Sequence, residues 1–130
     1  MSIRLVLDTS ALLAYLAGDT RSLDVGELLA SVEENGDLTG IPVACLIAAY
    51  RQVEAQHQAK LLQLAEGDDG PTVILPILAA DAASVAEKVL RLDLDRAQAA
   101  AETLKHDATL ATYEPAAYAA CLDEDDILDL

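Results

Sequence analysis

The sequence predicts a three-layer α/β/α domain, in which helices cover both faces of a central, mostly parallel sheet of four or five short strands. Short apolar runs rich in β-branched residues alternate with longer segments whose apolar residues recur every three to four positions. This alternation is typical of parallel strands joined by helices. A length of 130 residues and a hydrophobic content of 53% suit one packed domain that spans residues 1–130.

The first half of the chain is predicted to hold two strands and three helices. An apolar run that ends at Asp8 is typical of a strand buried on both faces, and Thr9 and Ser10 offer N-cap oxygens to the helix after it. Asp24 can cap a second helix, and Pro42 suits the first position of a long amphipathic helix. The predicted elements are a strand at 3–7, helices at 11–17 and 24–35, a strand at 38–41 and a helix at 42–66.

The second half continues the alternation after a loop rich in glycine and aspartate. The predicted elements are a loop at 67–71, a strand at 72–75, helices at 80–92 and 95–106, a strand at 109–112 and a half-helix from 114. The acidic tail that begins at Asp123 is either a frayed end or a final edge strand. In such a sheet, ligands collect beyond the carboxyl ends of the strands, which makes Asp8 the first candidate for a site residue. The alternative is a purely structural role, in which Asp8 accepts backbone N–H bonds at the turn from strand to helix.

The charge balance limits the classes of partner. The chain has 23 acidic and eight basic residues and a formal net charge of −15, which repels a phosphate backbone. The acidity is either a solubilising surface or an attraction for metal ions or a basic protein. Cys45 and Cys121 lack the spacing of a zinc or redox pair. With no signal-type or membrane-spanning apolar segment in the sequence, we expect a cytoplasmic protein without membrane contact.

Three segments resemble motifs of the PIN nuclease domain family. They are Leu7-Asp-Thr-Ser-Ala-Leu-Leu-Ala-Tyr-Leu16, Ile41-Pro-Val-Ala-Cys-Leu-Ile-Ala-Ala-Tyr-Arg51 and Ala108-Thr-Leu-Ala-Thr-Tyr-Glu114. Together they stretch across nearly the whole chain in the family's order and spacing. The resemblance implies a PIN-like fold of the VapC-like type, the toxin ribonucleases of toxin-antitoxin pairs. It also implies RNA cleavage with Mg²⁺ or Mn²⁺ held by acidic residues.

The first half of the family's acidic site is only partly matched. The first acid of the motif falls on Asp8, and Ser10 falls where the family has a serine beside the metal. The second acid falls on Ala48, whose methyl group cannot coordinate a cation. The next acid, Glu54, stands about 240° further round a helix and faces away.

The second half of the acidic site is also mixed. Counting back without gaps from Glu114, the fourth acid, places Arg96 at the third position, and a shift of one residue would place Asp95 there. Thr112, two residues before the fourth acid, is expected to line the same site. An arginine stays charged at any working pH and repels a metal ion. In the gapless alignment Arg96 could instead pair with Asp8, with Glu114 or with both.

Three functions follow for this site. The first is a catalytically degenerate PIN-like domain that serves as a binding or regulatory module and needs no cofactor. The second is an active endoribonuclease in which Asp8, Asp95 and Glu114 hold Mg²⁺ or Mn²⁺, with Asp8 and Glu114 as catalytic groups and RNA as substrate. The third, a phosphotransfer domain, would use Asp8 as acceptor. The resemblance further implies a homodimer and a small, basic, antitoxin-like partner.

Overall fold

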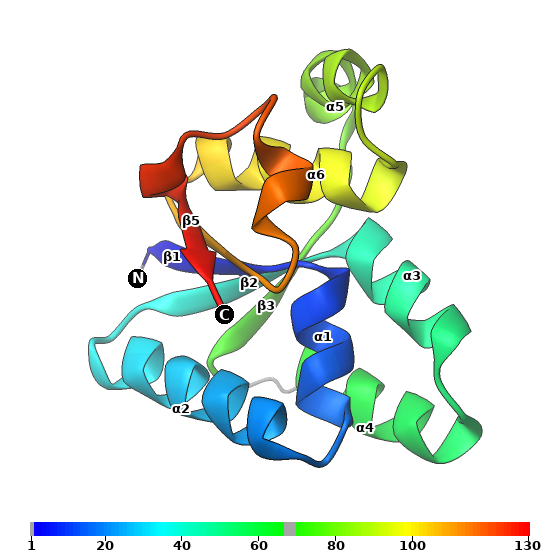
Figure 1. Cartoon of the computed structure of the whole chain (residues 1–130), viewed down its shortest axis with the longest axis vertical. Coiled ribbons are helices and arrows are strands. Elements are labelled where there is room, and N and C mark those ends of the chain that lie inside the picture. Colours follow the sequence, from blue (N-terminus) through cyan, green and yellow to red (C-terminus); the bar gives the residue numbers. More distant parts are fainter. Residues whose placement is uncertain (1, 67–69) are drawn as a thin grey trace.

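A computed structural model describes residues 2–66 and 70–130 of the chain and has the predicted α/β architecture. Five strands form one sheet in the order β3-β2-β1-β4-β5, and every neighbouring pair is parallel. β1 therefore lies at the centre of the sheet, as Figure 1 shows. The strands are β1 (Ile3–Leu7), β2 (Leu38–Pro42), β3 (Thr72–Leu75), β4 (Thr109–Thr112) and β5 (Ile127–Asp129).

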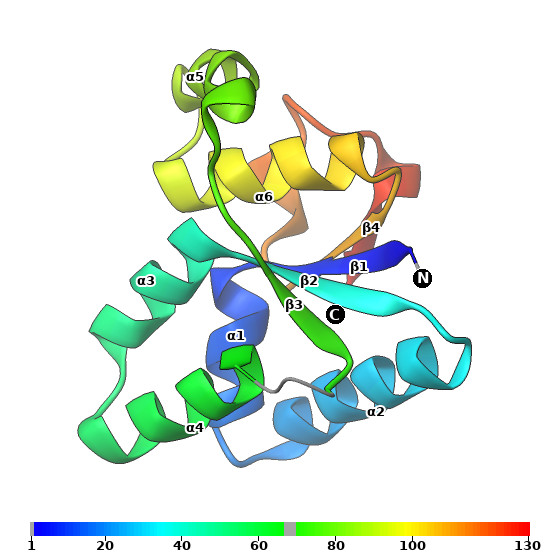
Figure 2. The same cartoon turned by 180° about the vertical axis from the view of Figure 1, so that it is seen from behind.

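Helices cover both faces of this sheet, so the predicted three-layer arrangement is confirmed. In Figures 1 and 2, α5 and α6 lie on one side of the strands and α1, α2 and α4 lie on the other. α3 contacts both α1 and α6. The helices are α1 (Thr9–Leu16), α2 (Thr20–Glu34), α3 (Val43–Gln52), α4 (Ala55–Glu66), α5 (Ala82–Val89) and α6 (Leu94–Lys105). Short 3₁₀ turns are η1 (Ala79–Asp81), η2 (Pro115–Tyr118) and η3 (Glu124–Asp126).

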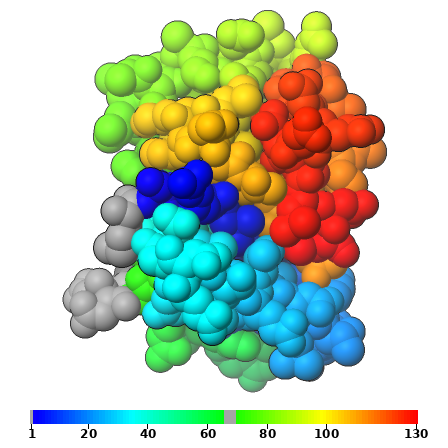
Figure 3. Space-filling view, turned by 90° about the vertical axis from the view of Figure 1, so that its left-hand side faces the viewer, coloured from blue at the N-terminus to red at the C-terminus, as the bar shows by residue number. Residues whose placement is uncertain are grey.

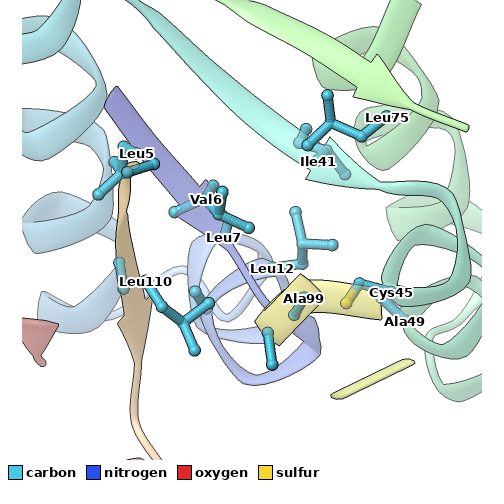
Figure 4. Close-up of a cluster of buried hydrophobic side chains, with 14 of the residues drawn as sticks. Leu5, Val6, Leu7, Leu12, Ile41, Cys45, Ala49, Leu75, Ala99 and Leu110 are labelled. Carbon is cyan, nitrogen blue, oxygen red and sulfur yellow. The ribbon is translucent and has the colours of Figure 1, made fainter. Parts of the chain in front are cut away.

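The core is built from branched aliphatic residues on the strands and small residues on α6. Val6 and Leu7 of β1 have no exposed surface, and neither have Ala97 and Ala99 of α6. Figure 4 shows several of these side chains together with Leu12 of α1. Alanine at these positions lets α6 lie close to the sheet, and so the chain packs a core without any phenylalanine or tryptophan.

The alignment of β1 with β4 brings the candidate site together. Leu7 of β1 lies opposite Ala111 of β4 in a parallel pair. The next residues along the two strands, Asp8 and Thr112, therefore emerge side by side at the carboxyl end of the sheet. Glu114 follows two positions later. Residues more than a hundred positions apart in the sequence thus reach one edge of the sheet.

The predicted long helix at 42–66 is wrong, because the structure has two helices there. Val53 takes an extended backbone, with φ −111° and ψ 157°, between α3 and α4. Gln58 compensates at the break, where its side-chain amide donates to the carbonyl oxygen of Tyr50 at 3.1 Å. The backbone carbonyl of Glu54 accepts from the N–H of Gln58 and so opens α4. No glycine or proline marks this break, and the apolar pattern continues across it. The sequence therefore predicted one helix where the structure has two.

Further boundaries differ from the predictions. α1 begins at Thr9, two residues before the predicted start, because Asp8, and not Thr9 or Ser10, accepts the capping hydrogen bond from the N–H of Ala11. α2 begins at Thr20, one turn before the predicted start, because Asp19 rather than Asp24 accepts the capping hydrogen bond, from the N–H of Arg21 at 3.0 Å. The predicted helix at 80–92 is shorter, since it opens as a 3₁₀ turn and its α-helical part ends at Val89.

The acidic tail forms the edge strand β5 and not a frayed end. β5 pairs with β4 from Leu110 opposite Ile127 to Thr112 opposite Asp129. Figure 3 shows these C-terminal residues, in red, as part of the surface on that side of the molecule. Of the predicted loop at 67–71, residues 67–69 lie outside the described residues.

Candidate functional site

A hollow of about 300 Å³ opens beyond the carboxyl ends of β1 and β4. We call it the acidic pocket, because four of its ten lining residues are aspartate or glutamate. The sequence-predicted residues that line it are Asp8, Ser10, Ala48, Asp95, Arg96 and Glu114. Thr112, the remaining predicted residue, lies beside Asp8 and donates a hydrogen bond to it.

The carboxylate of Asp8 is buried and accepts four hydrogen bonds. The residue is 2% exposed. Its Oδ1 accepts from the hydroxyl of Ser10 at 2.6 Å and from the backbone N–H of Ala11 at 3.1 Å. Its Oδ2 accepts from the hydroxyls of Thr112 at 2.6 Å and Tyr118 at 2.7 Å. A carboxylate has about four acceptor positions, so these donors fill the capacity of Asp8.

Local structure explains three of the four donors. Asp8 is the N-cap of α1, and its bond to Ala11 satisfies an N–H group that the helix leaves free. Thr112 arrives by strand alignment, and Tyr118 arrives because η2 turns back over the end of β1. Burial, together with the charge of Asp8, raises the pKa of the Tyr118 phenol far above its ordinary range, so the phenol stays a donor. With both oxygens occupied, Asp8 makes a poor phosphoryl acceptor.

The two hydroxyls beside Asp8 also fix the segment after β4. The Ser10 oxygen accepts from the backbone N–H of Tyr113 at 3.0 Å. The Thr112 oxygen accepts from the N–H of Glu114 at 2.9 Å. Since each hydroxyl hydrogen points to Asp8, the orientation of both groups is determined. This network holds the backbone that carries Glu114 at the edge of the acidic pocket.

Arg96 supplies a fixed positive charge to the acidic pocket. Its Nη2 donates to Oε2 of Glu114, and its Nη1 lies 3.5 Å from Oδ2 of Asp93. Partial burial disfavours the charged guanidinium, but the hydrogen bond and charge of Glu114 outweigh it and raise the pKa of Arg96. The predicted pair between Arg96 and Glu114 is therefore present. Among the described residues, Arg96 makes no ion pair with Asp8.

Asp95 and Arg96 both line the acidic pocket. The gapless alignment and the alignment shifted by one residue therefore each name a residue that reaches the site. Asp95 and Arg96 stand in the first turn of α6, where Oδ2 of Asp95 accepts from the hydroxyl of Thr9 at 2.6 Å. The thiol of Cys45 donates to the backbone oxygen of Asp95 at 3.2 Å. Burial raises the pKa of that thiol well above its ordinary value, so Cys45 is a packed, protonated group.

A buried glutamine fixes α3 and α6 relative to the sheet. Gln98 of α6 has no exposed surface; its Oε1 accepts from the N–H of Ala44 at 2.8 Å and its Nε2 donates to the oxygen of Leu75 at 2.7 Å. These bonds set the start of α3, and hence the place of Ala48, against the α6 turn that carries Arg96. Ala48 contributes only a methyl group to the lining.

The side chains of the acidic pocket do not fit a divalent metal centre. Mg²⁺ and Mn²⁺ prefer oxygen ligands that are free to coordinate. All acceptor positions of Asp8 are occupied, Glu114 is bound to Arg96, and Ala48 offers no ligand atom. Within residues 2–66 and 70–130, no group of three or more His, Cys, Asp or Glu side chains has the arrangement of a metal site.

An apolar groove of about 280 Å³ adjoins the acidic pocket and shares Ala48 and Asp95 with it. Ile47, Ile77 and Leu94 line this groove, and all three are exposed, with Ile47 at 56% and Leu94 at 53%. The two hollows therefore form one continuous surface, apolar at one end and acidic at the other. We call the second hollow the apolar groove.

Comparison of the chain with known protein families and curated sequences gives no match that would identify the site. No protein-family model matches the chain, and no curated protein sequence matches it. Among the described residues, no helix is both long and apolar enough to cross a membrane. The function therefore has to be inferred from the side chains of the acidic pocket and the apolar groove.

Sequence reasoning missed three residues that shape the site. Tyr118 donates to Asp8, Thr9 donates to Asp95, and Gln98 joins α3 to β3. A signal exists only for Gln98, because a polar residue stands among alanines on a helix face predicted to be buried. Tyr118 gives none, since its contact depends on the turn of η2.

Proposed function

We propose that this chain is a PIN-like domain without a working metal centre, kept as a binding or regulatory module. The observation that carries the proposal is the ion pair of Arg96 with Glu114 at the acidic pocket. It stands where the resemblance places two metal-binding acids of the family. A guanidinium held there repels a divalent cation and occupies the carboxylate that such a cation would need.

The surroundings of the ion pair support the same function. Asp8 has a full set of hydrogen-bond donors, so it stabilises the turn between β1 and α1 without a bound cation. The position of the second family acid carries Ala48. In the pocket, the carboxylates of Asp8 and Glu114 are both engaged by groups of this chain, which leaves neither of them free to hold a cation.

The partner that suits this surface is a basic, antitoxin-like protein segment. Exposed Ile47 and Leu94 would cover apolar side chains of the segment, while Asp93 and Asp95 would meet its lysine or arginine residues. The net charge of −15 would speed the encounter with a basic partner by electrostatic steering.

A second candidate function is a Mg²⁺- or Mn²⁺-dependent endoribonuclease. One observation favours it: the carboxylates of Asp8, Asp95 and Glu114 all line one hollow. Mg²⁺ can be bound by one or two carboxylates together with substrate phosphates. Such an ion would activate water for attack on RNA. This function requires Arg96 to leave Glu114 when substrate binds.

RNA cleavage separates the two functions. Purified wild-type protein and the Asp8→Asn variant are incubated with single-stranded RNA and Mn²⁺ under identical conditions. We expect equal, background cleavage from both proteins. Cleavage by the wild type above the variant would refute the degenerate function and support the nuclease.

Capture of a partner tests the binding role. Wild-type protein and the Ile47→Glu variant, which places a charge in the apolar groove, are immobilised and exposed to a lysate of the source cells. We expect a basic protein to be retained by the wild type, lost from the variant and released by salt. Equal retention by both proteins would place the binding elsewhere.

A further inference from the structure

The sheet has a free edge at β5. Among the described residues, β5 is the last strand in the sheet order and pairs with β4. The N–H of Leu130, directly after β5, donates to the carbonyl oxygen of Thr112 in β4 at 2.9 Å. Because backbone groups along a strand point alternately to its two sides, the N–H and carbonyl of Asp129 point away from β4. These groups are available to a further strand.

A hollow of about 610 Å³ lies beside this edge, against about 300 Å³ for the acidic pocket. Ile127 and Asp129 line it, whereas Leu128 between them does not, which fits the alternation of side chains along a strand. The hollow therefore lies on one face of β5. Its apolar lining consists of Pro115, Ala116, Ala119, Leu122 and Ile127. We call this hollow together with the free edge of β5 the β5 groove.

The charge of the β5 groove has one sign. Residues 107–130 contain seven acidic and no basic residues. Asp123, Glu124 and Asp129 line the hollow and are exposed. Within the described part of the chain, none of these three carboxylates takes part in an ion pair. The groove thus combines an apolar floor and unneutralised carboxylates with backbone groups that are ready for strand pairing.

We propose that the β5 groove binds an extended, basic segment of another protein, which adds a sixth strand to the five-stranded sheet. Strand addition obtains affinity from main-chain hydrogen bonds and specificity from alternate side chains. The fitting segment alternates lysine or arginine with apolar residues. A lysine stem would lie along Ala119 and Ile127, and its amino group would reach Asp129 or Glu124. The intervening apolar side chains would meet Leu128, which is 38% exposed.

Other occupants suit the groove less well. A second copy that paired edge to edge would bring its own acidic residues against these, and like charges repel. Nucleic acid and an anionic membrane surface are repelled for the same reason. An uncharged strand could form the backbone hydrogen bonds but would leave the carboxylates without a counter-charge. Charge complementarity therefore selects a basic segment.

The β5 groove is separate from the surface that the proposed function uses. The lining of its hollow shares no residue with the acidic pocket or with the apolar groove. Strand addition at β5 therefore does not depend on the function of the acidic pocket, and either proposal can fail without the other.

Fluorescence anisotropy with a labelled peptide of alternating lysine and valine tests the strand addition. We expect saturable binding to the wild-type protein. One control peptide has glutamate in place of lysine, and a second keeps the lysines but has N-methylated backbone amides, which cannot pair as a strand. We expect each control to bind at least about tenfold more weakly. A wild type that does not bind the lysine peptide, or that binds the N-methylated peptide equally well, would overturn the proposal.

Two substitutions at Asp129 separate the backbone from the side chain. Asp129→Pro and Asp129→Ala both remove the carboxylate, but only proline removes the N–H that points to the free edge. An edge strand tolerates proline at such a position, and circular dichroism checks the fold of both variants. We expect Asp129→Pro to bind the lysine peptide at least about tenfold more weakly than Asp129→Ala. Equal affinities would refute strand pairing, and the N-methylated peptide makes the same comparison on the unaltered protein.

Removal of two carboxylates tests the role of charge. The variant Glu124→Gln with Asp129→Asn should bind the lysine peptide at least about tenfold more weakly than the wild type. The matched control, Glu54→Gln with Glu87→Gln, removes the same charge from exposed positions outside the groove and should bind like the wild type. Ile47→Ser, in the apolar groove, should also bind like the wild type. A loss in either control as large as in the groove variant would place the peptide elsewhere and contradict the proposal.

Discussion

Arg96, in the first turn of α6, donates through its guanidinium to the carboxylate of Glu114, which follows β4, and so joins two elements across the acidic pocket. The two residues are 30% and 49% exposed at their side chains, so the pair stands at the surface of the pocket and not in the core. Its value for stability is therefore small. Its consequence is chemical, because it keeps a positive charge in contact with the Glu114 carboxylate.

Adding two carboxylates to the acidic pocket should create a metal site. In the double variant Ala48→Glu with Arg96→Asp, two acids join Asp95 and Glu114 and the repelling guanidinium is gone. We expect Mn²⁺ to bind at least about tenfold more tightly than to the wild type, as measured by calorimetric titration. The matched control, Ala48→Gln with Arg96→Asn, has the same shapes without the charges. An equal gain in the control would show that charge is not the missing element.

Removing the hydroxyl of Tyr118 should destabilise the fold. Tyr118→Phe deletes one of the four donors to the buried carboxylate of Asp8, at a cost of about 2 kcal/mol in the free energy of unfolding, typical of hydrogen bonds to charged groups. The control is Tyr113→Phe, because the Tyr113 hydroxyl is buried without a hydrogen-bond partner in the described part of the chain. Urea unfolding should show the control to be neutral or stabilised. Similar losses in both variants would contradict the role given to Tyr118.

Glu102 should make stability depend on pH. Its side chain is 4% exposed and lies 3.1 Å from Nε2 of His106. Burial raises the pKa of Glu102, with a further contribution from Asp81, while Lys105 and His106 oppose the shift. The folded chain therefore holds the Glu102 proton more tightly than the unfolded chain. Stability contributed by the protonated form is lost as pH rises from the ordinary glutamate range through the raised pKa.

The variant Glu102→Gln keeps the shape and removes this ionisation. We expect its Tm to exceed that of the wild type by about a few degrees at neutral pH and the gain to shrink in acid, below the ordinary glutamate pKa. Glu27→Gln, on the exposed surface of α2, is the control and should show no such trend. A gain for Glu102→Gln that is independent of pH would mean that ionisation is not its cause.

Loss of Gln98 should disturb both stability and the pocket. Gln98→Leu leaves the N–H of Ala44 and the carbonyl of Leu75 buried without their partner, at a cost of about 2 kcal/mol or more in the free energy of unfolding. Gln56→Leu, at an exposed position of α4, should stay within about 0.5 kcal/mol of the wild type. Thermal unfolding of the two variants checks this. Equal stability would mean that the hydrogen bonds of Gln98 to Ala44 and Leu75 contribute little to the stability of the fold.

The fold was predictable because strong local signals agreed with each other. The apolar run before Asp8, and the ability of Asp8 itself to cap a helix, determine a strand-turn-helix unit, and the alternation repeats along the chain. The break at Val53 was not predictable, because the side chain of Gln58 satisfies the freed carbonyl of Tyr50 in place of a glycine or proline signal. The choice of Asp19 over Asp24 as a cap likewise depended on where α1 ends.

The candidate site was predictable only in part, for a geometric reason. Positions that follow strands, such as Asp8 and Glu114, can be placed from sequence, because parallel strands end at one edge. The direction of the Arg96 side chain and the return of Tyr118 over β1 depend on packing between elements distant in the sequence. From the apolar periodicity of the helix, either Asp95 or Arg96 was expected to face the site. In the structure both residues, in the first turn of α6, line the acidic pocket.

Titration of the wild-type protein with Mn²⁺ tests the central claim most directly. The claim is that Arg96 supplies the positive charge of the acidic pocket and that no divalent cation is held there. Calorimetry should show no tight site, and the weak heats should be the same for wild type and Asp8→Ala. Tight, stoichiometric binding by the wild type that is lost in Asp8→Ala would contradict the claim.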